Sequence, residues 1–160
     1  MRGREKMKSA QKKTFSCKLL IFLQSFLGIG AIFGGGAFMI DPSGALINTP
    51  ISLLEPTPFS DFFIPGIILF FILGIIPFII IYGLVTKRPW RIANSLNIFD
   101  TLHWSWSFSL YIGFALIIWI TVQVFMINSV GFVHLVYIFL GLLIQAITLL
   151  PTVQKYYKKT

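Results

Sequence analysis

The sequence predicts an all-α membrane protein: a bundle of four transmembrane helices, with both termini in the cytoplasm and a structured outer loop between the first two spans. Three observations predict this fold. First, the chain of 160 residues is 56% hydrophobic and 11% charged, whereas soluble domains carry about 25% charged residues. Second, four long apolar runs contain no charged residue. Third, the basic residues fall on one side of the predicted topology.

The four apolar runs predict spans over residues 19–40, 62–85, 108–127 and 130–150. Each approaches or exceeds the roughly 20 residues that a helix needs to cross the hydrocarbon core, and hydrocarbon cannot satisfy free backbone polar groups, so each span must be helical. We expect one domain over residues 17–152, with basic cytoplasmic tails over 1–16 and 153–160. The first run is longer than the about 7–15 apolar residues of a secretory signal, so we expect it to be retained.

The distribution of basic residues predicts the orientation. All 13 lysines and arginines lie before the first span, between the second and third, or after the fourth. The loop at 41–61 and the turn at Asn128–Ser129 contain none. The positive-inside rule then places both termini in the cytoplasm. We expect the net charge of +8 to contact anionic lipid headgroups rather than nucleic acid, although a basic N-terminal arm is the alternative, and the composition fits a bacterial plasma membrane.

Small residues recur on two stripes of the first span: Gly28, Ala31 and Gly35 share one with Gln24, and Gly30, Gly34 and Ala37 form the other. Hydrocarbon is as apolar as leucine, so helices in a membrane gain most where small residues let their backbones approach closely. The two stripes therefore predict that the first span has close helical neighbours on two sides. In the second span, Pro77 predicts a kink, because proline lacks the N–H that would bond to the preceding turn.

The loop after the first span begins with turn chemistry. In Asp41-Pro42-Ser43-Gly44, proline fixes φ at the second position and glycine relieves the fourth. A short helical turn is expected over residues 49–55, with Thr49 as its N-cap. At the inner surface, Trp90, Trp104 and Trp106 are expected to form an interfacial aromatic belt.

Four polar side chains within the spans are candidates for function. Gln24 and Gln145 are expected at similar depth in the inner half, and Gln123 and His134 in the outer half. One interpretation is that each glutamine forms a hydrogen bond across a helix contact. The other is that the four line a polar path for a solute.

The sequence offers little for catalysis or cofactors. His103 and His134 begin spans at opposite membrane surfaces, so they are badly placed to share a haem or metal, and CxxC and HExxH motifs are absent. A triad of Ser43, Asp41 and His134 can be drawn, but turn chemistry already explains the first two. We therefore predict no catalytic, cofactor-binding or metal-binding residues, and no cofactor.

The runs "GGGAFMIDPSG", "PFSDFFIPG" and "GLLIQAITLLPTVQKYY" resemble those of small, uncharacterised four-helix bacterial integral membrane proteins. The resemblance implies the fold and the location, and no activity. The leading hypothesis is a non-enzymatic protein, of accessory or immunity type, that acts through packing with lipid, with a second copy of itself or with a membrane-protein partner. One alternative is a small transporter or channel subunit for a neutral or apolar solute, and another is a membrane enzyme that uses the outer loop.

Overall fold

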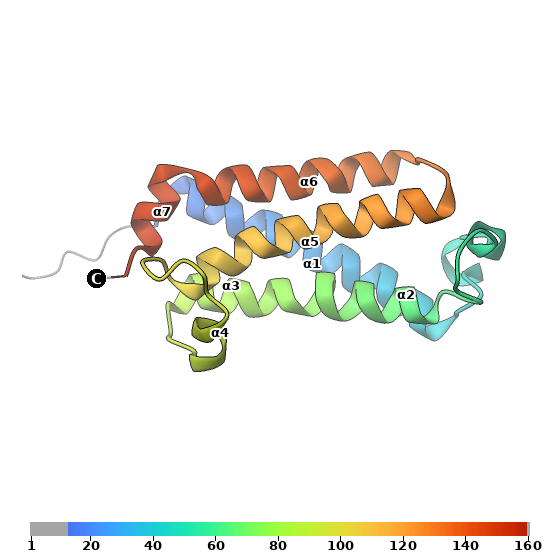
Figure 1. The fold of residues 1–160 in the computed structure, drawn as a ribbon, viewed down its shortest axis with the longest axis horizontal. Helices are drawn as coiled ribbons and strands as arrows, with labels where there is room; N and C mark the ends of the chain where they lie inside the picture. The colour runs from blue at the N-terminus through green and yellow to red at the C-terminus, as the bar shows by residue number, and fades with distance from the viewer. Residues whose placement is uncertain (1–12, 160) are drawn as a thin grey trace, which may run out of the picture.

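The computed structural model describes residues 13–159, which form a bundle of helices (Figure 1). Four helices in this part are long and apolar enough to cross a membrane. These are α1 (Phe15–Ile40), a second span made of α2 (Phe63–Ile68), η3 (Leu69–Ile75) and α3 (Ile76–Thr86), then α5 (Trp104–Ile127) and α6 (Phe132–Leu149). The predicted all-helical fold with four apolar spans is confirmed. Of the predicted tail over 1–16, residues 1–12 lie outside the described residues.

Four short elements complete the chain: η1 (Ala45–Ile47), η2 (Ile51–Leu54), α4 (Arg91–Ser95) and α7 (Pro151–Tyr157). The main packing relations form a closed ring, because α1 packs against the second span and α6, while α5 packs against α6 and α3. In Figure 1, α5 and α6 lie together above the second span, and α1 crosses behind them.

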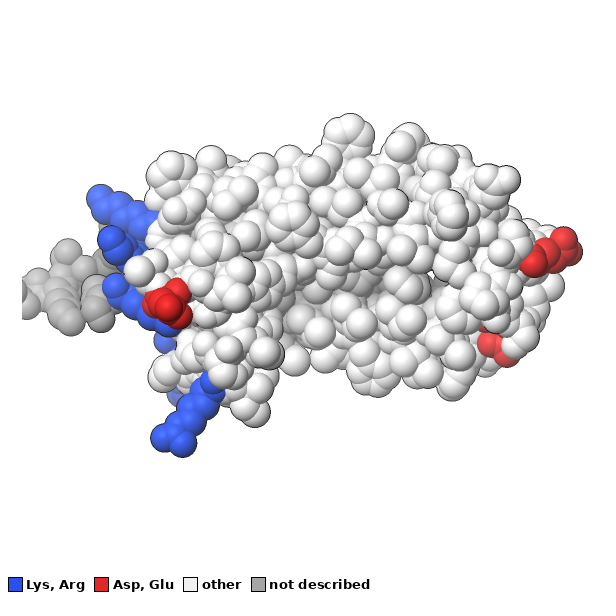
Figure 2. Space-filling view, in the orientation of Figure 1, with Lys and Arg blue, Asp and Glu red and all other residues white. Residues whose placement is uncertain are grey.

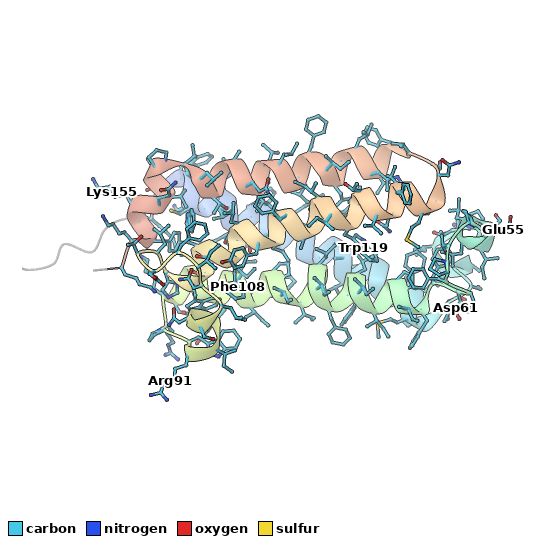
Figure 3. The ribbon with its side chains drawn as sticks, in the orientation of Figure 1. Glu55, Asp61, Arg91, Phe108, Trp119 and Lys155 are labelled. Carbon is cyan, nitrogen blue, oxygen red and sulfur yellow. The ribbon has the colours of Figure 1, made fainter. Side chains whose placement is uncertain are left out.

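Charge separates the two ends of the bundle. Figure 2 shows lysines and arginines gathered at one end, which we call the basic end, while the surface between the ends is uncharged in this view. Arg91 and Lys155 mark this end in Figure 3, and Glu55 and Asp61 mark the opposite one. We call the opposite end the loop end, because it carries the α1–α2 loop and the α5–α6 turn.

Glycines form a close seam between α1 and the second span. A Cβ atom on Gly35 would lie 2.7 Å from the Gly66 carbonyl oxygen and 2.6 Å from the Phe70 nitrogen. One on Gly28 would lie 3.1 Å from the Gly74 carbonyl oxygen. Glycine is therefore required along this seam, where backbone meets backbone.

The second span departs from regular α-helix before Pro77. The seven residues of η3 form π-helical turns, in which hydrogen bonds join residues five apart and the turn is wider. The widened stretch lies in the residues that precede Pro77, and α3 continues through the proline to Thr86. The kink expected at Pro77 stays a prediction.

The basic end is closed by side chains that were expected in a tail or at the membrane interface. Residues from 153 onward were predicted to be a tail, but α7 packs across the bundle with Val153 and Tyr157 buried, because its apolar side chains face inward. The Tyr157 hydroxyl donates to the Leu84 carbonyl at 3.0 Å. Trp104 and Trp106, expected in the aromatic belt, are also buried. Their indole N–H groups donate to the carbonyls of Arg88, at 2.9 Å, and Thr148, at 2.7 Å.

The α1–α2 loop is fixed by its own hydrogen bonds. Asp41 Oδ1 accepts from the backbone N–H and the hydroxyl of Ser43, at 3.1 and 2.6 Å. Gly44 adopts a φ of 79°, which glycine tolerates. The Phe62 N–H donates to the Pro42 carbonyl at 2.9 Å and joins the two ends of the loop. The short helix expected here begins at Ile51 as a 3₁₀ turn, and the Thr49 side chain does not cap it.

Candidate functional site

Two adjoining cavities lie at the loop end, where α5 separates from the second span. α5 packs closely against α3, and its contacts diminish toward η3. The cavities measure about 570 Å³ and about 220 Å³. Figure 2 shows the surface hollowed between α5 and the second span. They share six lining residues: Phe38, Leu69, Trp119, Gln123, Val133 and His134.

The lining is mostly apolar. The α1–α2 loop covers the larger cavity with Leu53, Leu54 and Phe59. The smaller cavity extends deeper into the bundle, to Leu27 and Leu116. The π-helical turns of η3 also face this space, since Leu69 lines both cavities and Leu73 lines the smaller one. Such turns occur frequently at functional sites.

Gln123 and His134, which were expected near each other, both line the two cavities. His134 stands in the first turn of α6, where its Nδ1 accepts the Gly131 N–H at 2.9 Å. Trp119 lies on the side of α5 that faces the second span (Figure 3). Its indole Nε1 is buried and meets no hydrogen-bond acceptor in the described part of the chain. Trp119 was not among the residues predicted from the sequence. The one signal for it is its position in mid-span, away from the interface where tryptophan is usually found.

Gln24 and Gln145, the other expected pair, lie toward the basic end and line neither cavity. Gln24 is fully buried, and its Nε2 donates to Ser109 Oγ at 2.7 Å. Gln145 packs one turn further along α5, where a Cβ on Gly113 would lie 2.7 Å from Gln145 Cγ. The two glutamines therefore contact neighbouring turns of one helix. The buried serines at 105, 107 and 109 were also missed; their signal is the alternation "WSWSFS".

The two stripes of small residues on α1 have different surroundings. Gly28 and Gly35 form the seam with the second span, whereas Gly30 and Gly34 line the smaller cavity. Gly30 lies against the hydroxyl of Tyr137, and a Cβ on Gly34 would lie 3.4 Å from the Leu69 side chain. Ala31 is buried and also lines the smaller cavity. The first span thus has close helical neighbours on two sides, as predicted, but its second stripe meets side chains of α6 and η3 beside the cavity instead of a helix backbone.

Residues 13–159 contain no group of three or more His, Cys, Asp and Glu that could hold a metal ion. Asp41 and Ser43 hydrogen-bond each other within the turn, and this bond lowers the pKa of the Asp41 carboxyl below its ordinary value. His134 is engaged by Gly131. These contacts satisfy a turn and a helix start.

The chain matches no protein-family model, no curated protein and no solved structure. The function is therefore argued from the cavities and their surroundings.

Proposed function

We propose that the protein binds a small apolar or amphiphilic molecule in the cavities at its loop end and acts without catalysis. The observation that carries this proposal is a space of about 570 Å³ lined by apolar side chains with a few convergent polar groups. Ligand sites in proteins occupy about 300–1,000 Å³ and have this kind of lining. The leading hypothesis from the sequence is a non-enzymatic protein that acts through packing with lipid or a partner. Binding of a lipid-like molecule is one specific form of that role.

The proposed orientation places the cavities in the outer half of a bacterial plasma membrane. The described basic residues gather at the end opposite the cavities (Figure 2), and the positive-inside rule assigns that end to the cytoplasm. There, Arg91 lies beside the exposed Ile92 and Leu96 of the α4 region. This combination suits contact with anionic headgroups through charge and with acyl chains through apolar side chains.

The proposed access route is lateral, from the lipid. The α1–α2 loop covers the cavities toward the loop end, and the hollow in Figure 2 lies on the side of the bundle, between α5 and the second span. A ligand dissolved in the outer leaflet would therefore reach the site without crossing water. Such a route favours molecules that partition into hydrocarbon.

The π-helical turns of η3 favour a second candidate, transport of the bound molecule, because they line the cavities and are wider than α-helical turns. Passage to the cytoplasm would require the basic half to open. That half is held by the bonds from Gln24 to Ser109, from Trp106 to Thr148 and from Tyr157 to Leu84. Binding requires none of these contacts to break, and for this reason it is our first proposal.

A photoreactive fatty-acyl probe that carries a diazirine tests the binding proposal in membranes. The Gly34→Leu variant would place a side chain in the smaller cavity, whereas Gly36 lines neither cavity and a Cβ there would lie 3.7 Å from the Phe70 ring. We expect labelled peptides from the α5–α6 lining in the wild type, several-fold less labelling in Gly34→Leu, and no change in the matched control Gly36→Leu. Equal labelling of all three proteins would contradict the proposal.

Cysteine labelling in intact cells tests the orientation. In a background with Cys17 replaced, Asn48→Cys lies in the α1–α2 loop and Lys158→Cys lies after α7, and both positions are exposed. A membrane-impermeant maleimide is expected to react at position 48 and to leave position 158 unlabelled until the membrane is permeabilised. The reverse pattern would place the cavities in the inner leaflet.

A further inference from the structure

The polar atoms of the cavities indicate what kind of molecule they receive. Trp119 lines both cavities, and its Nε1–H is buried without an acceptor in residues 13–159. An indole N–H can donate but cannot accept. Leaving such a donor buried and unpaired costs about 1–3 kcal/mol. A ligand that supplies an acceptor at this point would recover that free energy.

His134 offers a second donor at the same junction. The Gly131 backbone N–H donates to His134 Nδ1 at 2.9 Å, and a backbone N–H cannot accept. Nδ1 must therefore be the accepting nitrogen of a neutral imidazole, which leaves the proton on Nε2. Gln123 also lines both cavities. Its amide can donate or accept a hydrogen bond, so it can pair with a ligand acceptor just as the donors Trp119 and His134 do.

The linings contain no Asp, Glu, Lys or Arg among their residues. An ionised group would have no opposite charge to pair with there, and an unpaired charge inside a membrane protein is costly. The polar part of the ligand is therefore uncharged.

The position of the donors along the cavities gives the ligand its shape. Trp119, Gln123 and His134 belong to the lining that the two cavities share. Mostly apolar walls continue in both directions from this junction, toward Leu27 and Leu116 on one side and toward Leu53 and Phe59 on the other, with Tyr137 on the first side and the hydroxyls of Thr49, Thr57 and Ser129 in the larger cavity. A molecule that fills both cavities thus has apolar parts on either side of its polar group.

We propose that the ligand is a neutral lipid-like molecule whose polar group is a hydrogen-bond acceptor of the ester or ketone type, flanked by apolar chains. Its carbonyl oxygen accepts from Trp119 Nε1 and from His134 Nε2. This proposal rests on the proposed function, because it specifies the ligand of the same cavities.

Competition against the diazirine probe tests the proposal on the full chain in mild detergent. The competitors are octyl octanoate, which has a central ester, and heptadecane, an alkane of the same chain length. The variants are Trp119→Phe, which removes the N–H and keeps an aromatic ring, and the matched control Trp90→Phe at the basic end, which lines neither cavity. A melting curve for each variant verifies that it is folded.

We expect the ester to displace the probe from the wild type at least about fivefold to tenfold better than the alkane, since one hydrogen bond to an uncharged group is worth that factor and the ligand accepts two. Trp119→Phe should lower that preference about fivefold to tenfold, to the part that His134 supplies, and leave displacement by the alkane unchanged, and Trp90→Phe should behave as the wild type. Equal displacement by ester and alkane in the wild type would overturn the ligand class and leave binding itself intact. An equal loss for both competitors in Trp119→Phe would show that the indole acts through shape alone. If the probe does not label the cavities at all, the proposed function fails as well.

Discussion

The two halves of the bundle are both built from apolar helices, but their packing differs. At the basic end, tyrosine and tryptophan side chains donate to backbone carbonyls of neighbouring helices, and α7 covers the helix ends. At the loop end, α5 separates from the second span, and the space between them holds two cavities. The half that is held by cross-helix hydrogen bonds is thus the closed one.

The contrast follows from how helices associate in hydrocarbon. Burying apolar surface gains little there, so close packing depends on small residues and on interhelical hydrogen bonds. The basic half has both, with Gly83 against Trp104 and Gln24 bonded to Ser109. In the loop half, one stripe of small residues on α1 forms a seam and the other lines a cavity. The helices there are farther apart, which leaves the space of the two cavities.

The largest expected effect separates the two glycine stripes. Gly35→Leu would drive a side chain into the backbone of the second span, 2.6–2.7 Å from a Cβ at that position, and should cost at least about 3 kcal/mol, above the usual range for overpacking. Gly30→Leu should cost much less, because it meets the far end of one side chain, Tyr137, beside a cavity and not a helix backbone. Thermal unfolding in detergent measures both. Similar losses for the two variants would mean that both stripes carry helix contacts, as the sequence alone predicts.

A second pair of glycines compares the two halves directly. Gly83→Ala should destabilise the protein by about 1–3 kcal/mol, because the new methyl group meets the buried Trp104 ring and overpacks the basic half. Gly34→Ala adds the same atom at 3.4 Å from a leucine methyl group beside the smaller cavity. It should be neutral or stabilise by up to about 1 kcal/mol, since alanine is favoured over glycine within a helix. If Gly83→Ala were the milder change, the basic half would not be the tighter one.

Two tryptophans give the next comparison. Trp106→Phe removes an N–H that donates to the Thr148 carbonyl at 2.7 Å, and the unfolding free energy should fall by about 1–2 kcal/mol. Trp119→Phe removes an N–H that has no acceptor in the described chain, so it relieves the cost of an unpaired buried donor, and the unfolding free energy should not fall. Chemical denaturation in mixed micelles measures the difference. A large loss for Trp119→Phe would indicate that its indole supports the fold and not a ligand.

The smallest effect concerns pH and the loop. Hydrogen bonding from Ser43 holds the pKa of Asp41 below its ordinary value, so the carboxylate stabilises the turn above that value of about 4. The contribution is lost as the pH falls through the lowered pKa of the folded protein. Amide hydrogen exchange at Ser43 and Leu46 should therefore be constant from pH 7 to 5, after correction for intrinsic rates, and rise under more acidic conditions. In Asp41→Ala the faster exchange should already be present at neutral pH.

The sequence was sufficient for the four spans, because the length and polarity of each run determine whether it can cross a membrane. The helix starts were less accurate: α1 begins at Phe15 and α5 at Trp104, since the serines and tryptophans near the ends suit a helix as well as an interface. The cavities were beyond sequence reasoning. They arise from the separation of two helices that are distant along the chain, and no local pattern encodes that separation. Gln123 and His134 were found because polar groups in apolar runs are conspicuous, whereas Trp119 counts as apolar on most scales.

The π-helical turns of η3 have a consequence for counting residues. Gly28 and Gly35 stand seven positions apart on α1, and their partners Gly66 and Gly74 stand eight apart on the second span. At about 100° per residue, seven positions return a helix to within about 20° of the same face, while eight overshoot it by about 80°. A regular α-helix would therefore turn one of the two partner glycines away from α1. Wider turns use more residues for each revolution and bring the second glycine back. The second span thus accommodates one surplus residue and still keeps both of its glycines on the seam.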